Sequence, residues 1–273
     1  MPNDIRLGTQ GWNYDAWVGP FYPDGTRAAD FLGLYARAFD TVEVDSTFYA
    51  VPAERTVSGW AERTPPHFRF ALKLPQEATH ERRLRDAGGV LDAFVARARL
   101  LGPKLGPVLV QLGPDFGPAE LPALERFLPL LPNDVRFAVE FRQRAWITDG
   151  VLALLAGHGV ALALSDGPWV PRRWALKLAE RFAARPPAPF AYVRWMGPDR
   201  ALVDHSRVQV DRAGELGAWA EALGALAEGG TEVYGYVSNY YAGHGPENVR
   251  DVQRLLGRRP VEPDEIGDQL TLL

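Results

Sequence analysis

The residues best suited to chemistry are charged side chains at the ends of short apolar segments. Glu43 and Asp45 alternate with Val42 and Val44 in the stretch TVEVD. In a β-strand this spacing places both carboxylates on one face and both valines on the other. Glu140 ends a similar segment, RFAVE. Paired carboxylates can serve as general acid and base when nearby cations stabilise the charge that develops.

Basic residues occupy corresponding positions on other predicted strands. Lys73 and Arg194 each lie near the end of an apolar segment, and Arg142 follows Glu140 by two residues. Lysine is rare in this chain: of the 30 lysines and arginines, only Lys73, Lys104 and Lys177 are lysines. A compact ammonium has a tunable pKa that a guanidinium lacks. We therefore expect four catalytic candidates, with Glu140 as the leading acid or base: Glu140, Lys73, Asp45 and Glu43.

A second group is expected to bind a ligand around these residues. Its members end predicted strands or lie in the loops that follow, and several are aromatic: Arg194, Arg142, Asn239, His80, Trp12, Tyr49, Gln111 and Asp166. Aromatic rings beside polar groups suit a carbohydrate or nucleoside ring. The alternative for the charged members is a structural one, because charges inside a protein must be paired whether or not they are catalytic.

Two further site types can be weighed from the sequence. Glu43, Asp45, Glu140 and Asp166 offer oxygen ligands for Mg²⁺ or Mn²⁺, but no histidine ends a predicted strand. We therefore expect neither a metal ion nor an organic cofactor. The glycine loop AGHGPEN (242–248) opens a predicted helix and would suit a phosphate. Apart from His80, the histidines, His244 included, lie in connecting segments and are predicted at the surface.

The elements that position these residues alternate regularly along the chain. Apolar or alternating segments predict strands, and segments with helical periodicity lie between them. The predicted strands are 5–9, 41–45, 69–74, 107–112, 136–140, 160–165, 191–196 and 232–238. The predicted helices are 27–39, 54–63, 90–101, 118–131, 148–156, 172–184, 213–227 and 246–256. Eight β/α units predict an α/β fold, a single (β/α)8 barrel of the TIM type formed by one domain, 1–273. Active sites of such barrels lie at the carboxyl ends of the strands.

Composition narrows the classes of function. The formal net charge is −4 and the chain has no cysteine, so disulfides and thiolate chemistry are excluded. The acidic balance makes nucleic acid an unlikely partner and gives no attraction to anionic membranes. No secretion signal or membrane span is apparent, so the expected location is cytoplasmic. We expect a small-molecule ligand as partner, and the sequence assigns no oligomeric state.

Several motifs, in order, resemble those of the YecE-like family, also called domain of unknown function 72. They are GTQGWNY (8–14), VEVDSTFY (42–49), KLP (73–75) with Thr79-His80, and EFR (140–142) with Trp146. The resemblance runs from about residue 5 to residue 256 and implies a TIM-type barrel without a settled activity. Two segments differ from the family pattern. RWMG (194–197) replaces Arg-Leu-His-Gly, and VSNYY (237–241) replaces an ending in Phe-Asn-Asn. The first difference removes a histidine from the site.

These observations favour an enzyme with an acid–base site acting on a small sugar-like or phosphorylated ligand. One alternative is a metal-dependent phosphodiesterase or nuclease that binds nucleic acid. The other is a non-catalytic ligand-binding module, in which the same charged groups would pair with one another.

Overall fold

The computed structural model describes residues 5–268 and places eight parallel strands in one sheet. The strands are β1 (Ile5–Thr9), β2 (Thr41–Val44), β3 (Arg69–Lys73), β4 (Leu105–Gln111), β5 (Phe137–Glu140), β6 (Ala161–Asp166), β7 (Phe190–Trp195) and β8 (Glu232–Val237). From β2 to β8 each strand pairs with the next one in sequence, and β8 pairs with β1. The predicted (β/α)8 barrel is confirmed.

The seam between β1 and β2 closes the barrel with few main-chain hydrogen bonds. A bridge joins Gln10 to Glu43, and the amide of Gly11 donates to the carbonyl of Glu43 at 2.8 Å. Below that bridge the hydroxyl of Tyr35 accepts from the Thr9 amide at 2.8 Å and donates to the Thr41 carbonyl at 3.1 Å. Tyr35 therefore replaces a ladder hydrogen bond across the seam.

The strands approach so closely at this seam that only glycine fits at position 8. A Cβ atom there would lie 1.9 Å from the carbonyl oxygen of Thr41, which no side chain can tolerate.

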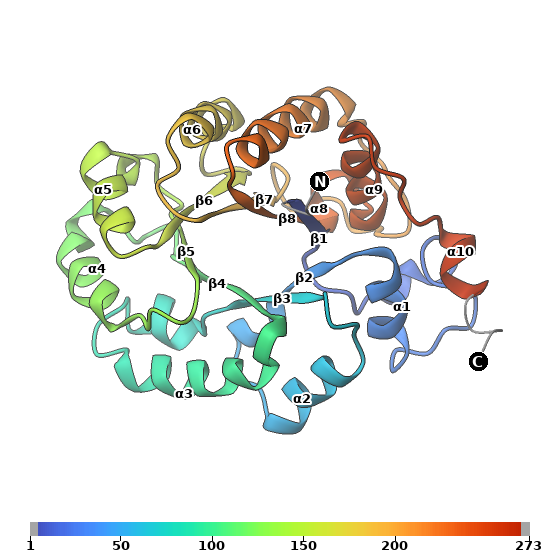
Figure 1. The fold of residues 1–273 in the computed structure, drawn as a ribbon, viewed down its shortest axis with the longest axis horizontal. Helices are drawn as coiled ribbons and strands as arrows, with labels where there is room; N and C mark the ends of the chain where they lie inside the picture. The colour runs from blue at the N-terminus through green and yellow to red at the C-terminus, as the bar shows by residue number, and fades with distance from the viewer. Residues whose placement is uncertain (1–4, 269–273) are drawn as a thin grey trace.

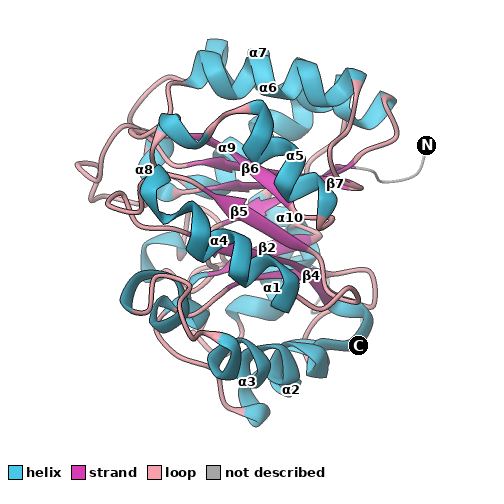
Figure 2. Ribbon diagram, turned by 90° about the vertical axis from the view of Figure 1, so that its left-hand side faces the viewer, coloured by secondary structure: helices cyan, strands magenta, loops and turns pink. Residues whose placement is uncertain are grey.

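Helices surround the strands as an outer layer (Figures 1 and 2). They are α1 (Phe31–Ala38), α2 (Glu54–Glu62), α3 (Gly88–Ala98), α4 (Leu121–Phe127), α5 (Asp149–Gly157), α6 (Arg172–Ala184), α7 (Ala213–Glu228), α8 (Asn239–Ala242), α9 (Gly245–Leu255) and α10 (Pro263–Asp268). The valines of β2, with Phe137, Val139 and Val193, belong to the large core between strands and helices. The predicted alternation of these strands is thus correct.

A second, smaller apolar cluster fills the inside of the barrel. Large rings come from neighbouring strands β7 and β8: Phe190, Tyr192, Tyr234 and Tyr236. Alanines face them from β3, β5 and β6: Ala71, Ala138, Ala161 and Ala163. Opposing large and small side chains in this way fills the interior without voids. The polar groups of interest lie one layer above, towards the carboxyl ends of the strands.

Element ends differ from the predicted ones in three places that matter for the site. β2 stops at Val44, because Asp45–Phe48 turns into a 3₁₀ helix. β6 continues through Asp166 instead of stopping at Ser165. His80 lies in a π-helical turn, Glu77–Glu81, rather than in an irregular loop. Such turns often occur at functional sites.

Candidate functional site

A buried arginine lies at the centre of the barrel mouth. Arg194, on β7, is 1% exposed and forms a two-pronged ion pair with Glu43 on β2. Its Nε donates to Glu43 Oε2 at 2.8 Å, and its Nη2 donates to Oε1 at 2.7 Å. The hydroxyl of Tyr192 also donates to Oε2, at 2.7 Å. Both oxygens of Glu43 are therefore occupied beneath the mouth.

The same arginine reaches across the barrel to β4 and β5. Its Nη1 donates to Glu140 Oε2 at 2.5 Å and to the side-chain oxygen of Gln111 at 3.2 Å. Ser165, on β6, donates to the same oxygen of Glu140 at 3.1 Å. Predicted residues from four strands thus converge on one buried network.

The two carboxylates in this network have different environments. Burial raises the pKa of Glu43 above its ordinary value, and attraction to Arg194 opposes that rise. Burial alone would also raise the pKa of Glu140, but attraction to Arg194 and Arg142 outweighs it, so this pKa is lowered. Glu140 is therefore ionised at neutral pH.

Only one oxygen of Glu140 is held in place. Oε2 accepts from Arg194 and Ser165, whereas Oε1 accepts no hydrogen bond within residues 5–268. Nε of Arg142 lies 3.6 Å from Oε1. A carboxylate fixed through one oxygen, with the other open to a pocket, is suitably arranged to take a proton from a ligand.

Lys73 and Asp45 form a separate pair at the edge of the mouth. Lys73 Nζ donates to Asp45 Oδ1 at 3.1 Å and lies 4.6 Å from the centre of the Phe48 ring. The lysine side chain is 10% exposed and the aspartate side chain 39% exposed. This pair is therefore accessible to a ligand, unlike the pair of Arg194 with Glu43.

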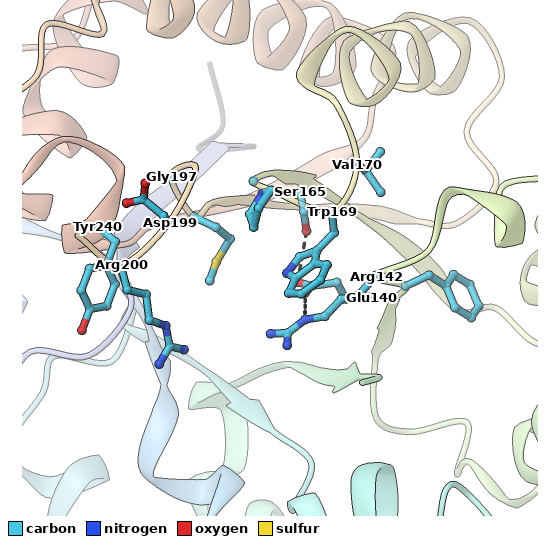
Figure 3. A pocket seen from close by; sticks show the side chains of 13 residues that line it. Glu140, Arg142, Ser165, Trp169, Val170, Gly197, Asp199, Arg200 and Tyr240 are labelled. Atoms are coloured by element: carbon cyan, nitrogen blue, oxygen red, sulfur yellow. Dashed lines mark hydrogen bonds and ion pairs between the residues drawn. The ribbon is translucent and has the colours of Figure 1, made fainter. Parts of the chain in front are cut away.

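Two adjoining pockets open above these residues. The first, here called the polar pocket, has a volume of about 540 Å³. Its wall includes Lys73, Asp45, His80, Gln111, Arg194 and Tyr49. The second, called the ring pocket, has a volume of about 310 Å³ and is lined by Glu140, Ser165, Trp169, Val170, Phe141 and Asp199, among others. Arg142, Met196, Arg200 and Tyr240 line both pockets. Figure 3 shows Trp169 beside Arg142 and Glu140, with Arg200 and Tyr240 across the ring pocket.

His80 enters the polar pocket from the π-helical turn Glu77–Glu81. Thr79 and His80 share a hydrogen bond between Oγ1 and Nδ1 at 2.9 Å, which fixes the imidazole ring. Burial, together with the charges of Arg142 and Lys73, lowers the pKa of His80, so the ring is neutral at pH 7. The following residues Arg83, Leu84 and Asp86 adopt positive φ angles. Non-glycine residues in this conformation store strain, which is found mostly around functional sites.

Three predicted ligand-binding residues lie outside the lining of both pockets. Asp166 points away from the barrel interior and accepts hydrogen bonds from Arg172 and Trp219. Asn239 Oδ1 accepts from the Trp17 indole and from the Gly245 amide. Trp12 packs edge-on against Trp60, with ring centres 5.8 Å apart. In each case local packing, rather than the mouth, engages the side chain. Glu43 likewise has no surface on either pocket.

The glycine loop after β8 is closed by the protein itself. Asn239 Oδ1 accepts a hydrogen bond from the backbone amide of Gly245. The backbone amide of Gln209 donates to the carbonyl of Ala242 at 2.7 Å. His244 is 3% exposed rather than at the surface, and it contacts the carbonyl of His205 through Nδ1 at 2.8 Å. Protein groups therefore fill the place where the sequence suggested a phosphate.

Neither a metal-ligand cluster nor a membrane-spanning helix is present in the part of the chain that the structure describes. No three His, Asp or Glu side chains among residues 5–268 converge as metal ligands would. Over the same range, no helix has the length and apolarity needed to cross a bilayer.

Sequence reasoning missed several pocket residues. Ser165, Met196 and Arg200 received no role, although all three line a pocket. Only the alternation of β6 could have indicated that Ser165 points into the barrel, because Ala161, Ala163 and Ser165 share a face of the strand. Arg200 lies in the long connection after β7, where spacing gives no direction.

Comparison with known proteins identifies the family. The family model described as "Protein of unknown function DUF72" matches residues 6–269. The chain belongs to the DUF72 family. A curated relative, the UPF0759 protein YecE of Escherichia coli, is 35% identical over 146 residues, which is 54% of this chain and 51% of YecE. The match thus spans about half the length of that relative.

Solved structures of the DUF72 family share the barrel. A family member from Thermotoga maritima aligns with a TM-score of 0.77 and 24% identity, covering 93% of this chain and 99% of the other. One from Enterococcus faecalis aligns with a TM-score of 0.72 and 22% identity, covering 93% and 95%. The family resemblance seen in the sequence is therefore confirmed. At these levels of identity, similarity to the solved structures supports the fold and nothing about activity.

Proposed function

We propose that this protein is an enzyme that performs acid–base chemistry on a small sugar-like or phosphorylated ligand at the barrel mouth. The observation that carries the proposal is the arrangement of Glu140. Its Oε2 is anchored by Arg194 and Ser165, and its Oε1 is free of hydrogen bonds within the described residues, beside a pocket.

The neighbouring groups have complementary roles. Arg194 and Glu43 hold Glu140 in position from below, since together they form a rigid, paired support. Lys73 presents an ammonium to the polar pocket and stabilises negative charge on the ligand. Asp45 is the second carboxylate, partly exposed and paired with Lys73. Tyr49 and Trp169 provide aromatic surface at the rim, since they are 72% and 45% exposed.

The test compares Glu140→Gln with wild type on a panel of pentose and hexose phosphates and the parent free sugars, followed by NMR. We expect one class of compound to be converted, and Glu140→Gln to lower turnover by about 10²–10⁴-fold. Glu125→Gln, a matched change on the exposed face of α4, should leave turnover unchanged. Turnover by Glu140→Gln within about threefold of wild type would refute the role of Glu140.

Each assay is also run after treatment with EDTA. We expect turnover to persist, because Lys73 and the arginines already supply positive charge. Loss of turnover that is restored by one divalent ion per chain would favour the metal-dependent phosphodiesterase instead.

One observation favours the ligand-binding module as second candidate. Arg194 is fully paired with Glu43 and Glu140, as expected for a network that is only structural. Binding of a sugar phosphate without conversion by wild-type protein, under all the conditions above, would support that candidate.

A further inference from the structure

Two of the four residues that line both the polar pocket and the ring pocket are arginines. Arg142 follows β5, and its guanidinium carbon lies 5.5 Å from the centre of the Trp169 ring. Arg200 follows β7, and its guanidinium carbon lies 5.6 Å from the centre of the Tyr240 ring. Aromatic faces orient each guanidinium and leave its N–H edge available for an anionic acceptor.

Neither arginine has a hydrogen-bonded acceptor in the part of the chain that is described. Arg142 Nε is buried without a partner, and Glu140 Oε1 stays 3.6 Å away, beyond hydrogen-bond range. Arg200 forms no ion pair there and contacts Tyr240 through its ring face. Most buried donors in proteins are satisfied, so the buried Nε–H of Arg142 indicates a missing acceptor. Arg200 is exposed, so its N–H groups are accessible to a ligand.

The two positive charges are also close enough to repel one another. Burial is the main reason why the pKa of Arg142 is lowered, and the positive charges of Arg194 and, to a smaller extent, Arg200 add to the lowering. An anion between the two guanidinium groups would remove this repulsion and supply the missing acceptors.

The distribution of charge decides on which side such an anion would lie. The polar pocket is lined by four basic residues, Lys73, Arg142, Arg194 and Arg200, and by one carboxylate, Asp45. The ring pocket also includes Arg142 and Arg200, but there two carboxylates, Glu140 and Asp199, balance their charge, and the rest of its lining is largely apolar and aromatic. An anionic group is thus favoured in the polar pocket and a planar, uncharged group in the ring pocket.

We infer that Arg142 and Arg200 clamp the phosphoryl group of a phosphate monoester whose other end is a planar ring bound beside Trp169. Arginine forks match phosphoryl oxygens through paired hydrogen bonds, and the nearby Lys73 favours a dianion over a carboxylate. The ring would lie against Trp169 and above Glu140 Oε1, so an N–H on the ring could donate to that oxygen. This inference rests on the proposed function only in placing the ligand at the same mouth.

Calorimetric binding of simple probes tests the inference without any turnover. The probes are phenyl phosphate, methyl phosphate, acetate and phenol. We expect phenyl phosphate to bind at least about tenfold more tightly than methyl phosphate, and acetate and phenol more weakly than either. Arg200→Gln should weaken both phosphate esters by about tenfold or more, the effect of losing a charge-assisted hydrogen bond. Arg200 is exposed, so this variant is expected to fold.

Two further variants separate the clamp from the ring site. Trp169→Leu should abolish the preference for phenyl over methyl phosphate while leaving methyl phosphate within about threefold of wild type. Arg207→Gln removes the same charge from the same connection, where Arg207 pairs with Asp204 in solvent, and should change neither affinity.

Equal binding of the two phosphate esters by wild type would overturn the ring site. Unchanged binding in Arg200→Gln would overturn the clamp. Probe binding as expected, with no conversion of any sugar phosphate, would leave this inference standing while removing the proposed function. Conversion that depends on Glu140, with no effect of Arg200→Gln on phosphate binding, would do the reverse.

Discussion

The hydrogen bonds of Arg194 distinguish a structural carboxylate from a reactive one at the barrel mouth. It is almost fully buried and binds Glu43 through two hydrogen bonds and Glu140 through one. A buried pair of this kind contributes little net stability, but removing one partner leaves a charge without compensation. The carboxylate with both oxygens engaged is therefore expected to be structural, and the one with a free oxygen to be reactive.

A comparison of two isosteric substitutions tests this division. Glu43→Gln should cost about 3–5 kcal/mol of unfolding free energy, because it removes the two-pronged partner of a buried arginine. At this chain size the melting temperature should fall by roughly 10 °C. Glu140→Gln should cost clearly less, because Arg194 keeps Glu43 and the new amide oxygen can still accept from Nη1. Thermal melts of both variants decide the matter.

The two outcomes that would contradict this view are easily recognised. Equal destabilisation by both substitutions would make Glu140 as structural as Glu43. A fall above about 10 °C in both Glu140→Gln and Lys73→Met would remove the catalytic assignment of these two residues.

At this scale the sequence predicted part of the site. Alternation on β2, β5 and β7 correctly placed Glu43, Glu140 and Arg194 inside the barrel. It failed for Asp166, because one more residue of β6 turns the side chain outwards. The position of Arg200 could not be predicted, because the long connection after β7 has no periodicity that would indicate where its side chains point.

Among the elements, the seam between β1 and β2 differs most from the regular pairing elsewhere. Its upper end carries a bridge between Gln10 and Glu43, and its lower part depends on a side chain of α1, Tyr35. The sequence identified both strands and the helix from their periodicities. It could not reveal that a tyrosine hydroxyl completes the sheet, because that contact depends on how the barrel closes.

Tyr35→Phe measures the contribution of this seam. The substitution leaves the Thr9 amide and the Thr41 carbonyl without their buried partner, which should cost about 1–3 kcal/mol. Urea unfolding gives the value directly. Tyr22→Phe is the matched control, because Tyr22 donates only one hydrogen bond, to the Trp12 carbonyl, and should cost less. A larger loss in Tyr22→Phe than in Tyr35→Phe would show that the seam hydroxyl is dispensable.

For the whole molecule, the buried His244 and the partly buried His80 couple stability to pH. Burial lowers the pKa of His244, and burial with nearby cations lowers that of His80. When the pH falls below about 6.5, the ordinary pKa of histidine, the unfolded chain binds protons that the folded chain does not. Stability should therefore decrease from that pH downwards, until the lowered pKa values are passed, and stay level above it.

Chemical denaturation at a series of pH values checks this expectation. His244→Gln, which keeps a donor for the His205 carbonyl, should reduce the acid-side slope. His158→Gln replaces an exposed histidine and should leave the slope as in wild type. A wild-type protein equally stable at pH 5 and pH 7 would contradict the assignment of His80 and His244 as neutral in the folded state.

The ion pairs of Arg194 also bear on how such a chain can be divided. Glu43 comes from the first half of the barrel, whereas Glu140 and Arg194 come from the second. Bisecting the gene between β4 and β5 would leave a lone carboxylate in one half-barrel and an arginine without its two-pronged partner in the other. Each fragment alone would then have to expose or neutralise a charge that the intact barrel keeps compensated. We expect each half to be unstable alone and to recover structure only when the two are co-expressed. Exchange of one half-barrel for that of another protein would then yield a folded product only where the new half supplies the missing counter-charge.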